Sequence, residues 1–430
     1  MQLRPYQNDV IDAVRAELQR GHKRILVVLP TGGGKTEIFT HIARRYTEAG
    51  YPTLVTVHRN ELLIQTSRRV GADHGLIAAG FTPNPTHDLQ VGMIQTLARR
   101  GTGGFKLILE DECHHAPANT NKKVREHNPD ATVIGFTATP LRGDGQGLGD
   151  FYDVMVEGPT CEWLTQQGYL APAKVYRPST INTRGIGVRY GEFKQRELQG
   201  VADTSQVTGC AVSHYRKYAD GKRTLVATVS IEHAVHVAER FCAAGYRFKA
   251  VHGGMSQGER DDAIGGLAAL DYHGLVYCEL FSEGVDCPVV ECGIFLRPTQ
   301  SLGLWDQQVG RIKRPSPGKD YAILLDHAGN SARFGIAEWG REWTLEKGKK
   351  RVGQGEALFK TRTCPVCFGV HRPSPVCPYC DHEYVGGGRV VEEVDGELEE
   401  MTAEEIARQR ARARHVLSAV GQRFERRLGQ

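Results

Sequence analysis

The sequence predicts an α/β protein with two parallel-sheet domains, a small cysteine module and a terminal helix. From residue 24 to 137, short β-branched and aliphatic runs alternate with helical segments, as in a parallel sheet covered on both faces. A second series of this kind begins near residue 224. Two Cys-x₂-Cys motifs lie between residues 364 and 380. The length of 430 residues is sufficient for two sizeable domains and an appendage.

The first series of elements opens with a helix over 7–20, where apolar residues recur at helical spacing. A buried strand over 24–28 follows, and the helix over 35–48 ends at Gly50, a good terminating residue. The further strands of this domain are predicted at 53–57, 91–97, 106–110 and 132–137.

The second series opens with a strand over 224–229 and a helix over 231–244 that is stopped by Gly245. Its further strands are predicted at 248–251, 273–277 and 321–325. The region between the two series is a connecting segment whose secondary structure the pattern does not define. The expected organisation is a first domain at 1–158, a connecting segment at 159–222, a second domain at 223–335, a linker with the cysteine module at 336–385, and an acidic linker with a basic amphipathic helix at 386–430.

The composition is that of an ordinary globular protein, with 40% hydrophobic and 24% charged residues. The net charge of +4 does not by itself indicate a nucleic-acid partner, so any basic surface must be local. No apolar run reaches ~18 residues and the N-terminus has no apolar signal region, so we expect a cytoplasmic protein without a membrane span. The cysteine distribution indicates reduced thiols and one metal site rather than disulfides.

A phosphate-binding loop is predicted at residues 29–36, where a glycine-rich turn joins the strand 24–28 to a helix. Glycines let backbone N–H groups converge on phosphate oxygens at the positive end of a helix. Lys35 is expected to reach the β- and γ-phosphates of a bound triphosphate, and the Thr36 hydroxyl is expected to bind Mg²⁺. The full pattern has a small residue where Leu29 stands, and the alternative is a turn that binds nothing. The rest of the expected phosphate cradle is Thr31, Gly32, Gly33 and Gly34.

Two carboxylates, Asp111 and Glu112, follow the predicted strand 106–110. Acidic residues at the C-terminal edge of an open α/β sheet, beside a phosphate loop, suit metal and water chemistry. We expect Asp111 to hold Mg²⁺ through its coordination shell and Glu112 to polarise the attacking water. The alternative is a solvated acidic turn.

In chain order, the motifs between residues 3 and about 314 resemble those of superfamily 2 helicases of the DEAD/DEAH type. The resemblance implies two tandem RecA-like domains of the phosphate-loop NTPase class. It also implies that the segment 3–7 reads adenine, with Arg4 and Gln7 at the nucleotide.

Other segments of the first domain resemble the family's coupling and nucleic-acid motifs. Thr137-Ala138-Thr139-Pro140 resembles the motif that couples hydrolysis to nucleic-acid binding, through Thr137 and Thr139. His114 is expected to be a coupling residue and not a metal ligand. The residues that the resemblance places on the nucleic-acid backbone are Arg59, Gln95 and Thr96.

Two motifs of the second domain complete the resemblance. Ser282–Asp286 resembles the motif that touches both nucleotide and nucleic acid, which places Gly284 and Asp286 at the nucleotide. The segment 307–314 matches Gln-x-x-Gly-Arg-x-x-Arg. Its two arginines are three apart and can point together at a γ-phosphate across a cleft, where a guanidinium is typically worth ~10³–10⁵ in rate. The alternative is a solvated helix face, and the catalytic residues expected are Lys35, Glu112, Gln307, Arg311 and Arg314.

The two Cys-x₂-Cys motifs are separated by nine residues. Four thiolates at such spacing can close a tetrahedral zinc site with no open position, so a structural Zn²⁺ is expected. Redox or unpaired cysteines are the alternative. Basic neighbours leave contact with nucleic acid or a protein partner open beside pure stabilisation. The expected ligands are Cys364, Cys367, Cys377 and Cys380.

The C-terminal region narrows the resemblance. The segment 325–330, Trp339, Trp343 and the four cysteines resemble the RadD-like bacterial and phage branch, which implies DNA and a bacterial or phage-infected cell. For the arginine-rich helix ending near Leu428, packing on the body or another subunit and binding to a phosphate backbone both remain open.

These motifs together predict an ATP-driven nucleic-acid motor, a DNA helicase or translocase in repair, recombination or replication. The alternatives are a DNA-stimulated ATPase that remodels protein–DNA complexes without unwinding, an RNA helicase, and a non-catalytic DNA-binding scaffold.

Overall fold

The chain divides into two units, residues 1–384 and 385–430, and all described residues lie in the first. The expected acidic linker and basic helix at 386–430 therefore lie outside the described residues. The computed structural model describes residues 3–71, 73–82, 84, 86–114, 118–141, 147–177, 181, 183, 185–189, 192–278, 287–346 and 360–384.

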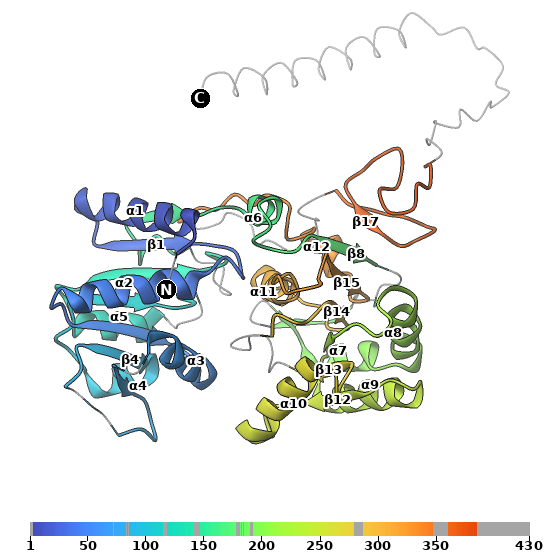
Figure 1. Ribbon diagram of the computed structural model, residues 1–430, viewed down its shortest axis with the longest axis horizontal. Coiled ribbons are helices and arrows are strands. Elements are labelled where there is room, and N and C mark those ends of the chain that lie inside the picture. The colour runs from blue at the N-terminus through green and yellow to red at the C-terminus, as the bar shows by residue number, and fades with distance from the viewer. Residues whose placement is uncertain are drawn as a thin grey trace, which may run out of the picture. The chain divides into compact units, whose positions relative to one another are not determined.

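The first sheet has seven parallel strands in the order β3-β4-β2-β5-β6-β1-β7. Because alternate residues of a strand face opposite sides, the strands feed two core clusters, one under α1, α2 and α3 and the other under α4 and α5 (Figure 1). The strands are β1 (Arg24–Val28), β2 (Thr53–Val57), β3 (Gly75–Ile77), β4 (Leu89–Met93), β5 (Leu107–Glu110), β6 (Thr132–Thr137) and β7 (Val154–Glu157), and the helices are α1 (Pro5–Gln19), α2 (Lys35–Glu48), α3 (Asn60–Val70), α4 (Ile94–Arg100) and α5 (Ala118–Glu126).

The second sheet has six parallel strands in the order β12-β13-β11-β14-β15-β8. Helices α8 and α9 pack on one face, and α10, α11 and α12 pack on the other. The strands are β8 (Ala173–Tyr176), β11 (Thr224–Ala227), β12 (Phe248–Val251), β13 (Gly274–Tyr277), β14 (Cys292–Phe295) and β15 (Ala322–Asp326), and the helices are α8 (Ser205–Tyr218), α9 (Ile231–Ala243), α10 (Gln257–Ala269), α11 (Leu302–Ile312) and α12 (Asn330–Phe334).

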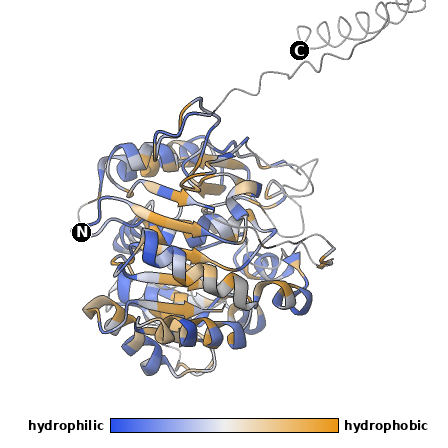
Figure 2. Cartoon of the chain, turned by 90° about the vertical axis from the view of Figure 1, so that its right-hand side faces the viewer, coloured by the Kyte–Doolittle hydropathy of each residue, from blue (hydrophilic) through white to orange (hydrophobic). Residues whose placement is uncertain are grey.

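Shorter elements connect and extend the two sheets. Figure 2 shows apolar strands in orange between helices whose outer faces are largely blue. Within the part of the chain that is described, no helix combines the length and apolar character needed to cross a membrane. The remaining elements are α6 (Cys161–Gln166), the hairpin β9 (Val188–Arg189) and β10 (Glu192–Phe193), α7 (Gln195–Ala202), and the antiparallel pair β16 (Arg362–Thr363) and β17 (Val370–His371).

The predicted fold class, two parallel-sheet α/β domains, is confirmed. The strands at 53–57, 132–137 and 248–251 have the predicted bounds. The prediction of one strand over 91–97 is wrong in its second half, because Ile94 and Leu97, three residues apart, are buried on one face of α4.

Four strands of the two parallel sheets have no counterpart among the predicted elements: β3, β7, β8 and β14. Strand β8 lies within the segment 159–222, which was expected only to connect the domains, and it pairs with β15 of the second sheet. These strands have three or four residues each, too few to show a clear period of two.

A buried ion pair fixes the end of β5 immediately before Asp111. Glu110 is 2% exposed, and Arg125 of α5 donates from Nε to Oε1 (3.1 Å) and from Nη2 to Oε2 (2.6 Å). The hydroxyl of Tyr152 also donates to Glu110 Oε2, and burial raises the pKa of this phenol well above its usual value. Every oxygen of this carboxylate is therefore used by the fold, which leaves the next two acids for chemistry.

Replacing Arg125 by Met should lower the free energy of unfolding by about 3–5 kcal/mol, because the Glu110 carboxylate would stay buried without its cation. Thermal and denaturant unfolding measure this loss. Lys122→Met is the matched control on the same helix, since Lys122 and Glu126 form an exposed pair worth at most about 1 kcal/mol. Equal losses in the two variants would contradict a structural role for the buried pair.

Candidate active site

The phosphate loop joins β1 to α2 through two glycines in the left-handed region. Gly32 has φ = +84° and Gly34 has φ = +79°, conformations that side chains other than glycine rarely adopt. Gly33 N donates to Pro30 O (2.9 Å), which closes the turn. The N-cap of α2 is Gly34, which has no side chain to cap the first turn, so the N–H groups of that turn remain available to an anion.

A cavity of about 430 Å³ lies against this loop and is lined by both domains. Residues of the phosphate loop, both carboxylates after β5 and the end of α11 contribute to its wall. Of the residues expected at the ATP site, the cavity brings together Arg4, Gln7, Thr31, Gly32, Gly34, Lys35, Thr36, Asp111, Glu112, Gln307, Arg311 and Arg314. Gly33 belongs to the same loop but does not line the cavity.

Opposite charges meet at the centre of this cavity. Lys35 Nζ lies 3.4 Å from Glu112 Oε1 and 3.5 Å from Leu29 O, to which it donates. Glu112 has φ = +44°, a conformation that costs a non-glycine residue of order 1–3 kcal/mol. Its N–H donates to Asp111 Oδ1 (3.0 Å), which keeps the two carboxylates at this edge of the sheet.

A chain of polar contacts leads from Glu112 toward the second domain. His114 Nδ1 lies 3.5 Å from Glu112 Oε2 and 2.8 Å from Thr137 Oγ1. The single Thr137 hydroxyl proton is donated to Thr139 O (2.9 Å), so His114 Nδ1–H donates to Thr137. The chain reaches α11, because a Cβ on Gly303 would stand 2.9 Å from Thr139 Oγ1.

Helix α11 lies directly on the phosphate loop. A Cβ on Gly310 would stand 2.4 Å from Thr31 Cβ, a distance that atoms do not adopt. In the same wall, Thr31 Oγ1 and Gln307 Nε2 are buried and make no hydrogen bond to any described residue. Buried polar atoms are nearly always paired, so two such atoms on residues that line one cavity fit a polar ligand such as a nucleoside triphosphate.

Tyr169 lines the cavity beside Arg4 and Gln7, and this part of the wall is here called its aromatic end. Gln7 Oε1 accepts from Arg4 N (2.8 Å), and the Arg4 guanidinium lies 4.8 Å from the ring centroid of Tyr169, which lines the cavity. The Tyr169 ring stacks on Trp163 with centroids 6.0 Å apart. Tyr169 was missed in the sequence because it stands in the connecting segment, outside every motif. Two aromatic residues six positions apart, Trp163 and Tyr169, are the local sequence signal that could have indicated a role for Tyr169.

The residues expected on nucleic acid lie apart from the cavity. Arg59 is exposed at the N-cap of α3, directly after β2. Gln95 and Thr96 stand in the first turn of α4, after β4, and Gln95 is exposed. Because β2 and β4 are parallel neighbours, all three follow one C-terminal edge of the sheet. Gly284 and Asp286 lie outside the described residues.

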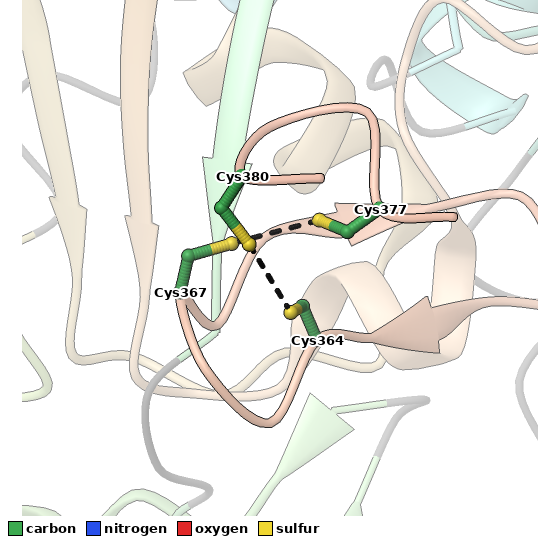
Figure 3. Close-up of side chains that lie close together, drawn as sticks. All are labelled: Cys364, Cys367, Cys377 and Cys380. Atoms are coloured by element: carbon green, nitrogen blue, oxygen red, sulfur yellow. Dashed lines mark hydrogen bonds between the residues drawn. The ribbon is translucent and has the colours of Figure 1, made fainter. Parts of the chain in front are cut away.

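The four cysteines of the module converge on one point (Figure 3). Their sulfur atoms all lie within 4.8 Å of one another, and two pairs, Cys364–Cys380 and Cys367–Cys377, are 3.7 Å apart. Thiolates around a tetrahedral Zn²⁺, with Zn–S bonds of ~2.3 Å, are separated by about 3.8 Å. The donor set therefore fits zinc.

The two cysteine turns have the same backbone pattern. Phe368 N donates to Cys364 O, and Asp381 N donates to Cys377 O at the equivalent place. The module packs on the edge of the second sheet, where Arg177 N donates to Phe368 O (2.9 Å) and Tyr218 Oη donates to Cys367 O (3.2 Å). It covers the edge strand β8, which would otherwise expose unpaired backbone groups.

Comparison with known proteins places this geometry in a family. The profile described as "Type III restriction enzyme, res subunit" matches residues 1–142, and "Helicase conserved C-terminal domain" matches residues 208–316. A "51.5 kDa protein" of a Lactococcus phage (isolate 7-9) is 30% identical over 370 residues, which are 84% of this chain and 78% of that protein. The chain belongs to the superfamily 2 helicases. Its sheets are the tandem RecA-like domains of an ATP-dependent nucleic-acid motor.

Two further comparisons define the extent of the likeness. The "Putative ATP-dependent helicase IRC3" of Saccharomyces cerevisiae (strain ATCC 204508 / S288c) is 29% identical over 77% of this chain and 52% of its own length. The solved structure "ATP-dependent Type ISP restriction-modification enzyme LlaBIII bound to DNA" has a TM-score of 0.57 and 18% identity, over 76% of this chain and 28% of that one. This superfamily 2 chain thus spans about half of the yeast relative. The RadD-like branch stays a prediction.

Proposed function

We propose that this helicase-family chain is a DNA-dependent ATPase that hydrolyses ATP in the cavity between its two domains and uses the cycle to move along DNA. The observation that carries the proposal is one cavity holding both halves of a split ATP site. Its first-domain half contains Lys35, Thr36, Asp111 and Glu112, and its second-domain half contains Gln307, Arg311 and Arg314.

The binding roles follow from the chemistry of each wall. The phosphate loop and Lys35 take the β- and γ-phosphates, while Thr36 and Asp111 supply oxygen ligands for Mg²⁺. The metal, when bound, neutralises charge on the phosphate oxygens. At the aromatic end, Arg4, Gln7 and Tyr169 take the adenine.

The hydrolytic roles use the charges that already meet in the cavity. The ammonium of Lys35 contacts Glu112, and bound phosphates compete for that ammonium. Glu112, released from Lys35, accepts a hydrogen bond from water and orients its oxygen for attack on the γ-phosphorus. Arg311 and Arg314 then neutralise the charge that develops on the transferred group.

In this proposal, the chain of polar contacts from Glu112 couples ATP hydrolysis to movement of α11. His114, Thr137 and Thr139 link the carboxylate to the start of α11, so movement of α11 changes the surroundings of Glu112. Arg59, Gln95 and Thr96, at the C-terminal edge of the first sheet, contact the nucleic-acid backbone in this proposal. The proposed domain bounds remain 1–158 and 223–335, and β8 of the connecting segment adds a strand to the second sheet.

DNA is proposed as the nucleic acid on two supports. The solved neighbour LlaBIII is described as bound to DNA, and the C-terminal motifs resemble the RadD-like branch. The proposed pathway is DNA repair, recombination or replication. Zinc in the four-cysteine cluster is proposed to stabilise the module, since four protein ligands leave no position for substrate.

Glu112→Gln should leave ATP binding intact and reduce kcat by about 10²–10⁴-fold, because the amide cannot serve as the base. A binding titration with ATP and a phosphate-release assay measure the two effects. Glu126→Gln, which changes an exposed acid on α5, is the control and should match the wild type. Wild-type turnover by Glu112→Gln would refute the assignment.

Single-stranded, duplex and forked DNA should each be compared with RNA as stimulators of ATP hydrolysis, with strand displacement followed on the fork. Stimulation by DNA is expected because the proposed motor needs DNA to close its cleft productively. Stimulation with displacement identifies a helicase, whereas stimulation without it identifies a translocase or a remodeller of protein–DNA complexes. Stimulation by RNA alone would overturn the proposal of DNA.

Freshly purified protein should contain about one zinc per chain, and Cys377→Ser should lose it. Metal analysis tests the stoichiometry, and thermal unfolding tests the expected destabilisation, since metal binding and folding of such modules are linked. Cys242→Ser, an exposed cysteine on α9, is the control and should retain the metal. A wild-type chain without zinc would contradict the metal assignment.

A further inference from the structure

Helix α11 is held by residues that neither family profile covers. It carries Gln307 and Arg311, and Arg314 follows two residues after its end. The matched ranges are 1–142 and 208–316. Among the side chains from outside both ranges that contact this helix and its flanks, Glu192 accepts from Gln300 N and Thr299 Oγ1, Arg341 pairs with Asp306, and Glu338 pairs with Lys313.

Of the charged side chains in these three contacts, Lys313 is the most buried. Lys313, directly before Arg314, is 0% exposed. Its ammonium donates to Glu338 Oε1 and to Thr165 Oγ1 (3.0 Å). Glu338 Oε1 also accepts from Ala173 N (2.8 Å). A fully buried ammonium is costly unless it is paired and hydrogen-bonded, and here both conditions are met.

The Thr165 partner belongs to a segment that packs on the first domain. Leu164 and Leu170, on either side of it, lie in the core cluster beneath α1 and α2. Leu170 also meets the phosphate loop, since a Cβ on Gly32 would stand 2.8 Å from Leu170 Cδ2. Tyr169 of the same segment lines the ATP cavity. Lys313 therefore joins α11 to the segment that touches the phosphate loop and the aromatic end of the cavity.

The backbone around Arg314 is fixed separately. Lys319 Nζ donates to Arg314 O (2.7 Å), Val290 O (2.5 Å) and Ile312 O, all groups of the second domain. In addition, Ala171 N donates to Lys313 O (2.8 Å). The turn is thus secured to its own domain by Lys319 and to the connecting segment that packs on the first domain by Lys313.

We propose that Lys313 and Glu338 are positioning residues for ATP hydrolysis, a role that rests on the proposed function. Their ion pair and the hydrogen bond to Thr165 hold the Arg314 turn at the phosphate end of the cavity. An arginine that acts on developing charge must be placed within about 1 Å, and misplacement by that amount can cost about 10²-fold in rate. Neither Lys313 nor Glu338 touches the reacting atoms, because neither lines the cavity.

The test is DNA-stimulated ATP hydrolysis by Lys313→Met, Glu338→Gln and the double variant, with kcat, KM and the unfolding temperature measured for each. The expected result is a fall in kcat of about ten- to hundredfold, with KM for ATP within about twofold of the wild type. In the double variant no buried charge lacks its partner, so stability should recover relative to Lys313→Met. The proposal expects kcat to stay low in that variant, whereas a purely structural pair would recover activity with stability.

Thr165→Val keeps the ion pair and removes the hydrogen bond to the first domain. Thr165→Val should fold normally and lower kcat by a smaller factor than Lys313→Met does. If Lys313→Met does not fold, Thr165→Val still tests the proposal. Lys222→Met, which breaks the Lys222–Glu291 pair elsewhere in the second domain, is the control and should match the wild type.

Failure of this proposal can be told apart from failure of the proposed function. A wild-type chain that hydrolyses ATP through Glu112, with unchanged kcat in Thr165→Val and the double variant, overturns the positioning role alone. A loss confined to KM overturns it as well. A wild-type chain without DNA-stimulated hydrolysis overturns both proposals.

Discussion

The close approach of α11 to the phosphate loop is the constraint on which the site depends. Gly310 lies so near Thr31 that a Cβ would stand 2.4 Å from the threonine Cβ. This contact brings Gln307, Arg311 and Arg314 to the wall that also contains Lys35. A larger residue at position 310 would hold α11 away from the phosphate loop and separate the two walls of the cavity. The two halves of the site therefore meet because α11 has a glycine, without a side chain, where it packs on the phosphate loop.

The ionic contact inside the cavity has a cation that a bound phosphate can take over, whereas the neighbouring buried pair stabilises the fold. Glu112, which follows Asp111, has a positive φ, and this backbone conformation costs conformational free energy in a residue other than glycine. The Glu112 carboxylate contacts Lys35. By contrast Glu110, one residue earlier than Asp111, is saturated by Arg125 and Tyr152. The fold thus separates a permanently paired acid from one whose cationic partner is also the expected phosphate ligand. The strained backbone at Glu112 fits a residue held for chemistry, since the adjacent buried pair keeps the strand end in place.

Local sequence signals predicted the parts of the site that lie on continuous strand–turn–helix units. The phosphate loop, the carboxylates after β5, and Arg311 and Arg314 at and after the end of α11 are of this kind, and the cavity brings them together. Contacts between distant segments were not predictable, because no periodicity or motif marks them. Tyr169 and the Lys313–Glu338 pair belong to this group. So does β8, whose four residues become a strand only by pairing with β15.

The segments outside the family profiles also restrict how the cleft can open. The chain passes from α6 to β8 through residues 167–172, and in this passage Ala171 N donates to Lys313 O. Lys313 is bonded to Thr165 at the same place. A hydrogen bond from a charged donor contributes about 1.5–3 kcal/mol, so an opening that breaks the link is costly.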